Sequence, residues 1–116
     1  MKVSICCITY NHGKYIRKAI DSFLAQKRNF DIEILINDDA STDDTANIIR
    51  EYQEKYPDII KPLFHEENMY SQGVTNPSGT YNFPRATGKY IAMCEGDDYW
   101  CDENKLQIQV DYMEDH

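Results

Sequence analysis

Two adjacent carboxylates follow a short apolar segment in the last third of the chain. Asp97 and Asp98 come directly after Glu95 and Gly96, which follow the apolar run 90–94. The run has the character of a buried strand, and ligands of open α/β sheets bind outside the carboxyl ends of the strands. There Asp98, or Asp97 together with Asp98, could bind Mg²⁺ or Mn²⁺, with water and ligand phosphates filling the other coordination positions. The alternative is a solvated acidic turn before a helix, because Asp is a common turn residue.

A second acidic pair and an aromatic residue stand at the ends of two other expected strands. Asp39 could accept a hydrogen bond from the imide N–H of a nucleobase, and Tyr10 could stack on the ring of that base. The alternative for Asp38 and Asp39 is charge complementation at the start of a helix, which we favour for Asp43 and Asp44. The alternative for Tyr10 is ordinary packing at the core or its rim.

The chain lacks the glycine-rich motifs that hold phosphates through the backbone. No G-x-G-x-x-G follows the first expected strand, and no G-x-x-x-x-G-K-[ST] occurs anywhere. A diphosphate would therefore have to be held through a divalent cation, which would also stabilise the diphosphate as a leaving group.

Hydrophobic periodicity predicts strands that alternate with helices. The expected strands are Val3 to Thr9, Ile32 to Asn37, Ile59 to His65 and Tyr90 to Cys94. The expected helices run through Ile16 to Leu24, through Ala46 to Tyr56, around Asn82 to Thr87 and from Glu103 to His116. Ser41 or Thr42 is expected to cap the second of these helices.

This alternation predicts a mostly parallel sheet with right-handed crossovers. Pro62 cannot donate a hydrogen bond to a neighbouring strand, so the third strand is expected at an edge. The resulting strand order is 3-2-1-4, which puts a topological switch point between the first and fourth strands. The segments Thr9-Tyr10-Asn11, Asp38-Asp39 and Asp97-Asp98 would then meet at one rim, which favours a ligand site over three unrelated turns.

Composition narrows the class of protein. With 116 residues the chain is expected to form one domain, and its net charge of -8 argues against a nucleic-acid partner. No apolar run has transmembrane length, and no signal peptide precedes the first strand. We therefore expect a cytoplasmic protein with free thiols. The four cysteines show no metal-ligand spacing, and His12 and His65 are expected to be solvated or structural.

Three motifs, in order, resemble the amino-terminal, nucleotide-sugar-binding half of family 2 glycosyltransferases with the GT-A fold. The resemblance covers essentially the whole chain. The motifs are the opening strand with its Thr9-Tyr10-Asn11 turn, the loop Asp38-Asp39-Ala40-Ser41-Thr42-Asp43, and Gly88-Lys89-Tyr90-Ile91 leading to Glu95-Gly96-Asp97-Asp98. It implies a Rossmann-like three-layer α/β/α fold, truncated, in which residues 1–116 form the donor-binding domain.

The resemblance also implies a role for each site residue. Thr9 and Tyr10, with Asn11 beside them, would line the base pocket, and Asp39 would read a uracil-type base. Asp97 would contact the ribose or diphosphate region, and Asp98 would hold Mn²⁺ or Mg²⁺.

The sequence departs from the family pattern at three points. Ile8 stands where Pro is common, Ala40 stands where Gly is common, and the Asp97-Asp98 pair lacks the spaced Asp-x-Asp form. None of these departures removes a proposed ligand, but they leave open the identity of the nucleotide and the shape of the turn after the second strand.

Family 2 enzymes continue into an acceptor-binding half that carries the general base, and no segment here corresponds to it. We therefore expect that the complete protein is an inverting glycosyltransferase and that this segment alone is inactive. The resemblance implies a UDP-sugar donor, a saccharide or lipid-linked acceptor, cell-surface polysaccharide biosynthesis, and peripheral association with the inner face of the membrane.

Three other functions fit parts of the pattern. A non-catalytic nucleotide or nucleotide-sugar binding domain would differ in not consuming the donor. A phosphoacceptor signalling domain would carry its acidic pair after the first strand, where Thr9-Tyr10-Asn11 stands instead. A nucleotidyltransferase would have a glycine-rich phosphate loop near that strand, and none is present.

Overall fold

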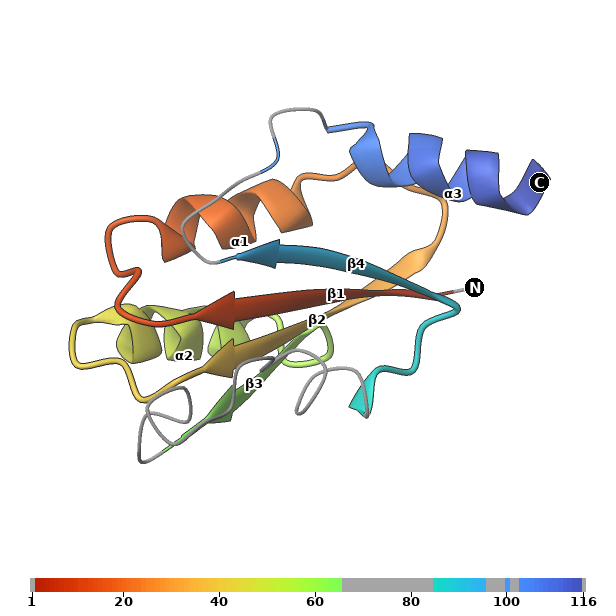
Figure 1. Ribbon diagram of the computed structural model, residues 1–116. Coiled ribbons are helices and arrows are strands. Elements are labelled where there is room, and N and C mark those ends of the chain that lie inside the picture. The colour runs from red at the N-terminus through yellow and green to blue at the C-terminus, as the bar shows by residue number, and fades with distance from the viewer. Residues whose placement is uncertain (1, 66–84, 96–99, 101–102, 116) are drawn as a thin grey trace.

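The computed structural model describes residues 2–65, 85–95, 100 and 103–115. Four parallel strands form one sheet: β1 (Lys2–Thr9), β2 (Asp31–Asp38), β3 (Ile60–Phe64) and β4 (Tyr90–Glu95). Their spatial order is β3-β2-β1-β4, so the predicted order is confirmed (Figure 1). β3, which contains Pro62, is an edge strand, as expected from the missing N–H of proline.

Three helices follow the strands along the described chain: α1 (Ile16–Leu24), α2 (Thr45–Lys55) and α3 (Lys105–Asp115). Their apolar residues and alternate residues of the strands form one buried cluster, so the three helices cover the same face of the sheet (Figure 1). The pairing register supports this, because Val3 faces Ile32 and Ile5 faces Ile34 within that cluster.

Most of the expected element boundaries agree with the structure to within two residues. The short helix expected at 82–87, between β3 and β4, lies mostly outside the described residues. The loop between α1 and β2 anchors the last helix, since the Gln26 side-chain oxygen accepts the Leu106 N–H at 3.0 Å and the Lys27 N–H donates to the Glu103 carbonyl at 2.7 Å. The first of these bonds satisfies an N–H in the first turn of α3, which has no partner within the helix.

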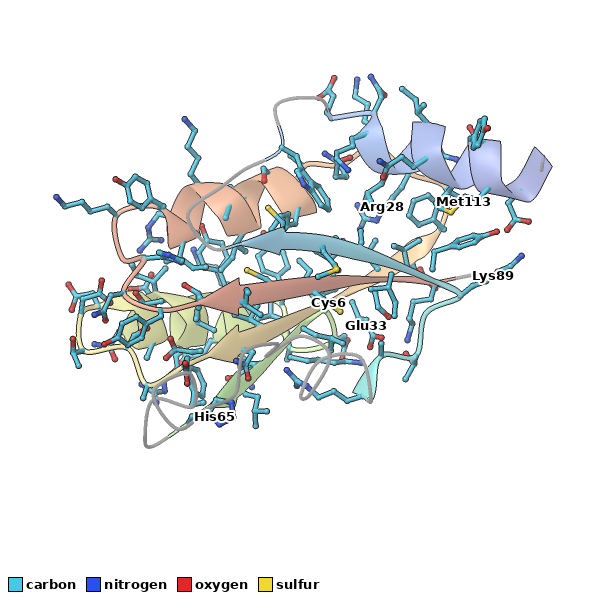
Figure 2. All side chains as sticks on the ribbon, viewed as in Figure 1. Cys6, Arg28, Glu33, His65, Lys89 and Met113 are labelled. Atoms are coloured by element: carbon cyan, nitrogen blue, oxygen red, sulfur yellow. The ribbon has the colours of Figure 1, made fainter. Side chains whose placement is uncertain are left out.

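A buried carboxylate organises the face of the sheet that points away from the helices. Glu33, only 1 % exposed, accepts hydrogen bonds from the Ser4 hydroxyl at 2.6 Å and the Thr87 N–H at 2.7 Å, and it pairs with Lys61 Nζ at 3.1 Å. Desolvation opposes the ionisation of Glu33, but these hydrogen bonds outweigh it and lower the pKa from 4.5 to about 2. Figure 2 shows Glu33 between the sheet and the segment that leads into β4.

This cluster fixes the start of β4. The Gly88 N–H donates to Ser4 Oγ at 2.8 Å, and the Lys89 N–H donates to the Lys2 carbonyl at 2.8 Å. β4 then runs alongside β1 until Glu95 pairs with Ile8, one residue before β1 ends. β4 therefore ends at the rim where β1 and β2 also end.

Candidate functional site

The carboxyl ends of β1 and β2 bring most of the predicted site residues together. Thr9 pairs with Asp38 at the ends of the two strands, and the Asp39 N–H extends the pairing by donating to the Thr9 carbonyl at 3.0 Å. Thr9 and Asp39 are buried, whereas Tyr10 is 44 % exposed. An exposed aromatic ring next to a rim of polar backbone is suited to stacking on a planar ligand.

The loops after β1 and β2 are joined by hydrogen bonds. The Asn11 N–H donates to Ser41 Oγ at 2.9 Å, and Asn11 Oδ1 accepts the Thr42 N–H at 2.7 Å. A second link joins the Gly13 N–H to Asp43 Oδ2 at 3.0 Å. The rim is therefore one connected structure rather than two independent turns.

Each of these loops contains a residue in the left-handed backbone region. Asn11 has φ 53° and Ala40 has φ 58°. Asparagine tolerates this region better than most residues, whereas alanine pays the full steric cost of its Cβ. The turn after β2 is thus left-handed at the position where the sequence has Ala40 in place of the more common Gly.

Asp38 is held inside the rim rather than presented to a ligand. The residue is 2 % exposed and accepts a short hydrogen bond from the Ser41 hydroxyl. Burial raises the pKa of Asp38, although the hydrogen bonds from Ser41 act in the opposite direction. The Asp38 carboxylate therefore supports the loop that contains Asp39 and Ser41.

The expected capping of the second helix is wrong. α2 begins at Thr45 with Asp44 as its N-cap residue, and the side chain of Asp44 makes no cap hydrogen bond. Ser41 and Thr42 are bonded to Asp38 and Asn11 instead. Their polar groups are therefore engaged by the rim and not by the start of α2.

Asp43 takes part in holding the start of α2. Its carboxylate accepts the Thr45 N–H at 3.0 Å, a short bond from the Thr45 hydroxyl, and the N–H of Gly13. Desolvation opposes the ionisation of Asp43, but these hydrogen bonds prevail and lower its pKa. Because three donors bind the Asp43 carboxylate, its role is to stabilise the fold and not to bind a ligand.

Both histidines that the structure describes near the rim have structural contacts. His12 Nδ1 lies 2.9 Å from Thr9 Oγ1, and His65 Nε2 lies 2.6 Å from Asn37 Oδ1. The backbone N–H of His65 also donates to the Asp38 carbonyl at 3.1 Å. Figure 2 shows His65 at the carboxyl end of β3. This agrees with the structural interpretation of both residues.

A metal centre is not complete within residues 2–65, 85–95, 100 and 103–115. No group of three or more His, Cys, Asp or Glu side chains in these ranges could hold a metal ion. Asp38 and Asp43 are engaged by hydrogen bonds, so the acidic loop after β2 fits support of the fold better than metal binding. Asp97 and Asp98, the residues predicted for the diphosphate and the metal, lie outside the described residues.

The sequence pattern did not reveal the links between the loops. Asn11 was expected only as a residue of the base pocket, and its bonds to Ser41 and Thr42 join residues thirty or more positions apart. The one local signal was an Asn after the strand, because Asn adopts the left-handed conformation that tight turns need.

Within the described residues, no helix combines the length and hydrophobicity needed to cross a membrane.

The sheet order, the alternation of helices and strands, and the rim of polar residues define a Rossmann-like α/β protein of the GT-A type. The family model for glycosyl transferase family 2 matches residues 4–116. The chain therefore belongs to glycosyl transferase family 2, as its motifs indicated.

Similar proteins include both uncharacterized and named members. An uncharacterized protein of Mycobacterium tuberculosis is 45% identical over 98% of this chain and 32% of its own length. The Escherichia coli UDP-Glc:alpha-D-GlcNAc-diphosphoundecaprenol beta-1,3-glucosyltransferase WfaP is 37% identical over 97% of this chain and 41% of its own length.

A solved structure with the same fold is S. aureus TarS 1-349 in complex with UDP-GlcNAc. It superimposes with a TM-score of 0.80 and 28% identity, covering 100% of this chain and 32% of that one. The chain thus spans about a third of the length of the first relatives that it matches.

Proposed function

We propose that residues 1–116 form the donor-binding domain of a glycosyltransferase that transfers a sugar from UDP to an acceptor hydroxyl. The observation that carries the proposal is the shared rim, where Thr9, Tyr10 and Asp39 meet at the ends of β1 and β2. Support comes from WfaP, whose name specifies UDP-Glc, and from the complex of TarS with UDP-GlcNAc.

The base end of the donor lies at the described part of the rim. Tyr10 stacks on the uracil ring with its exposed side chain, and Thr9 lines the base pocket. Asp39 accepts the imide N–H of the uracil, for which a carboxylate is a stronger acceptor than a neutral oxygen.

The diphosphate end is assigned to the acidic residues that follow β4. Asp98 binds Mn²⁺ or Mg²⁺, and Asp97 contacts the ribose or the diphosphate. Two facts support this division: β4 ends beside Ile8 at the shared rim, and the carboxylates of Asp38 and Asp43 are already occupied. A cation at this end neutralises the diphosphate of the donor and the charge that develops as it leaves.

The acceptor, a saccharide or a lipid-linked saccharide, is bound by a part of the complete protein beyond these residues. That part supplies the general base for an inverting displacement, so the 116-residue chain binds the donor without turning it over. The complete protein acts in cell-surface polysaccharide synthesis on the cytoplasmic side, where it associates peripherally with the membrane.

Titration calorimetry with UDP, GDP and CDP, each with Mn²⁺ and again with a chelator, tests the proposal. UDP binding that requires the cation and exceeds GDP binding is the expected result. Equal affinity for all three nucleotides would contradict the role of the rim in base recognition. Equal binding of UDP in chelator would contradict the metal bridge alone. Hydrolysis or transfer of the sugar by the complete protein, measured with UDP-Glc and UDP-GlcNAc, then tests catalysis.

A further inference from the structure

The side-chain oxygen of Asn11 is fully used by the neighbouring loop. Asn11 Oδ1 accepts the Thr42 N–H at 2.7 Å and the Thr42 hydroxyl at 3.3 Å. An amide oxygen has two acceptor positions, so both are occupied by Thr42. Asn11 therefore has no side-chain acceptor left for a donor nucleotide, although it stands next to Tyr10 in the turn that was expected to line the base pocket.

The backbone of Asn11 is also bonded to the same loop. Its N–H donates to Ser41 Oγ at 2.9 Å, and the Ser41 hydroxyl in turn donates to the buried carboxylate of Asp38. Asn11 thus contacts two successive residues of the loop after β2. A polar chain runs from the turn after β1, through Ser41, to the end of β2.

This connection joins the two chain segments that carry the residues assigned to the base. Tyr10 directly precedes Asn11, and Asp39 directly precedes Ala40, the left-handed residue of the other loop. Fixing Asn11 to Ser41 and Thr42 therefore fixes the backbone that carries Tyr10 relative to the backbone that carries Asp39. Preorganisation of this kind raises affinity because the loops need not be ordered when the ligand binds.

We propose that Asn11 is a positioning residue, which holds the loop 10–13 against the loop 38–43 and does not contact the donor itself. The proposal rests on the proposed function, because the ligand that the two loops share is the uracil end of UDP. It replaces the expectation that Asn11 binds the substrate directly.

Two substitutions separate the effect of the left-handed backbone conformation of Asn11 from the effect of its side-chain acceptor. Asn11→Gly preserves the left-handed conformation but removes the acceptor. Asn11→Asp keeps an acceptor oxygen for Thr42. The matched control is Asn29→Gly, the same change at an exposed loop residue that precedes β2 at the opposite end of the sheet. Thermal unfolding of all variants checks that each is folded before binding is measured.

The first readout is independent of any ligand. In the free protein, Asn11→Gly is expected to accelerate hydrogen exchange of the Thr42 amide about tenfold or more, because its acceptor is gone. Asn11→Asp and Asn29→Gly are expected to leave this rate within about twofold of the unmodified protein. Unchanged Thr42 exchange in Asn11→Gly would show that the loops are not held by this side chain and would overturn the proposal.

The second readout is a double-mutant cycle for binding of UDP with Mn²⁺. Asn11→Gly is expected to weaken UDP about tenfold in the unmodified protein but less than about twofold in an Asp39→Ala background. Uridine has no phosphate that an added carboxylate would repel, so it is expected to bind Asn11→Asp nearly as well as the unmodified protein. If Asn11 acts by positioning the loop through Thr42, the carboxylate of Asn11→Asp should restore the uridine affinity that Asn11→Gly loses.

Equal losses in both backgrounds would indicate direct contact between Asn11 and the donor and would overturn the proposal. So would normal affinity of Asn11→Gly for UDP. Failure of the unmodified protein to bind UDP would instead overturn the proposed function, and the positioning role with it. The exchange rate of the Thr42 amide distinguishes that failure from loss of the link between the loops.

Discussion

Gly88 lies so close to Ser4 that no side chain fits between them. The Gly88 N–H donates to Ser4 Oγ at 2.8 Å, and a Cβ on Gly88 would stand 2.6 Å from the Ser4 backbone nitrogen and 2.9 Å from the Lys2 carbonyl oxygen. Both atoms belong to the backbone of β1 and cannot rotate away. The closeness of the two segments therefore sets where β4 begins and hence where its carboxyl end meets the rim.

Gly88→Ala is accordingly expected to destabilise the protein by about 1–3 kcal/mol and to weaken metal-dependent UDP binding. Gly13→Ala is the matched comparison, because the three atoms nearest to its Cβ would all belong to the side chain of Asp43, the closest at 2.9 Å. The Asp43 carboxylate can rotate away at the expense of its hydrogen bonds to Gly13 and Thr45, so a smaller loss is expected there than from a clash with backbone. Urea unfolding of both variants measures the difference, and equal losses would contradict the argument from the rigid backbone of β1.

The sequence predicted the arrangement of the sheet because its determinants are local. Short apolar runs define the strands, and Pro62 excludes β3 from the centre of the sheet. Contacts between distant residues could not be read in this way. Glu33 resembles any charged residue at an alternate strand position, and only the fold shows that Thr87, 54 positions away, satisfies it.

The failed prediction of the helix cap has the same origin. Ser41 and Thr42 are common capping residues, and their spacing before α2 was reasonable. The fold assigns their hydroxyl and amide groups to Asp38 and Asn11, which lie in other parts of the rim. Local capping preference was outweighed by these tertiary hydrogen bonds. The polar residues that meet at the rim were thus predicted from residue type and strand order, whereas the hydrogen bonds that join them were not.

Glu33 is expected to make stability depend on pH. Its pKa in the folded protein is about 2, below the ordinary value of 4.5. The contribution of Glu33 to the free energy of unfolding, roughly 3 kcal/mol, is therefore present above about pH 4.5 and is lost as the pH falls towards 2. Replacing Glu33 by Gln removes this contribution, so the difference in stability between the two proteins should shrink as the pH falls.

Urea unfolding at several pH values between 6 and 3 measures this difference. Glu51→Gln is the control, because Glu51 pairs with Arg17 through exposed side chains that are 55% and 50% accessible. Exposed pairs contribute little, so this variant should follow the unmodified protein at every pH. A constant gap between Glu33→Gln and the unmodified protein over the whole range would contradict the lowered pKa.

Ala40→Gly is expected to stabilise the protein. Ala40 has φ 58°, where the Cβ of an L-residue costs about 1–2 kcal/mol, while glycine gives back part of that gain through its freer unfolded chain. The net increase in the free energy of unfolding should be about 1 kcal/mol. Ala25→Gly is the control, because Ala25 has φ −78° and no strain to relieve. A stabilisation shared by both variants, or by neither, would contradict the argument from backbone strain.

Asp98→Ala is expected to abolish the part of UDP binding that depends on Mn²⁺. The residual affinity should equal that of the unmodified protein in chelator, because only the diphosphate end loses its contact. Asp58→Ala, which removes one exposed carboxylate just before β3, is the control for the change in net charge. Calorimetry with and without the metal measures both. If Mn²⁺ still increased the affinity of Asp98→Ala for UDP, the metal would have to be bound by residues other than Asp98.

Asp39→Ala is expected to act at the opposite end of the donor. A hydrogen bond to a charged acceptor contributes about 1.5–3 kcal/mol, so the affinity for uridine, which has no phosphate, should fall about tenfold to a hundredfold in the absence of metal. Asp44→Ala controls for charge, because Asp44 is exposed and makes no cap hydrogen bond at the start of α2. Titration of uridine by nuclear magnetic resonance can measure such weak binding. Since Asp39 and Asp98 are assigned to different ends of one ligand, Asp39→Ala should leave the stimulation of UDP binding by Mn²⁺ intact. If the stimulation is lost as well, Asp39 belongs to the metal site and the division between base and diphosphate ends is wrong.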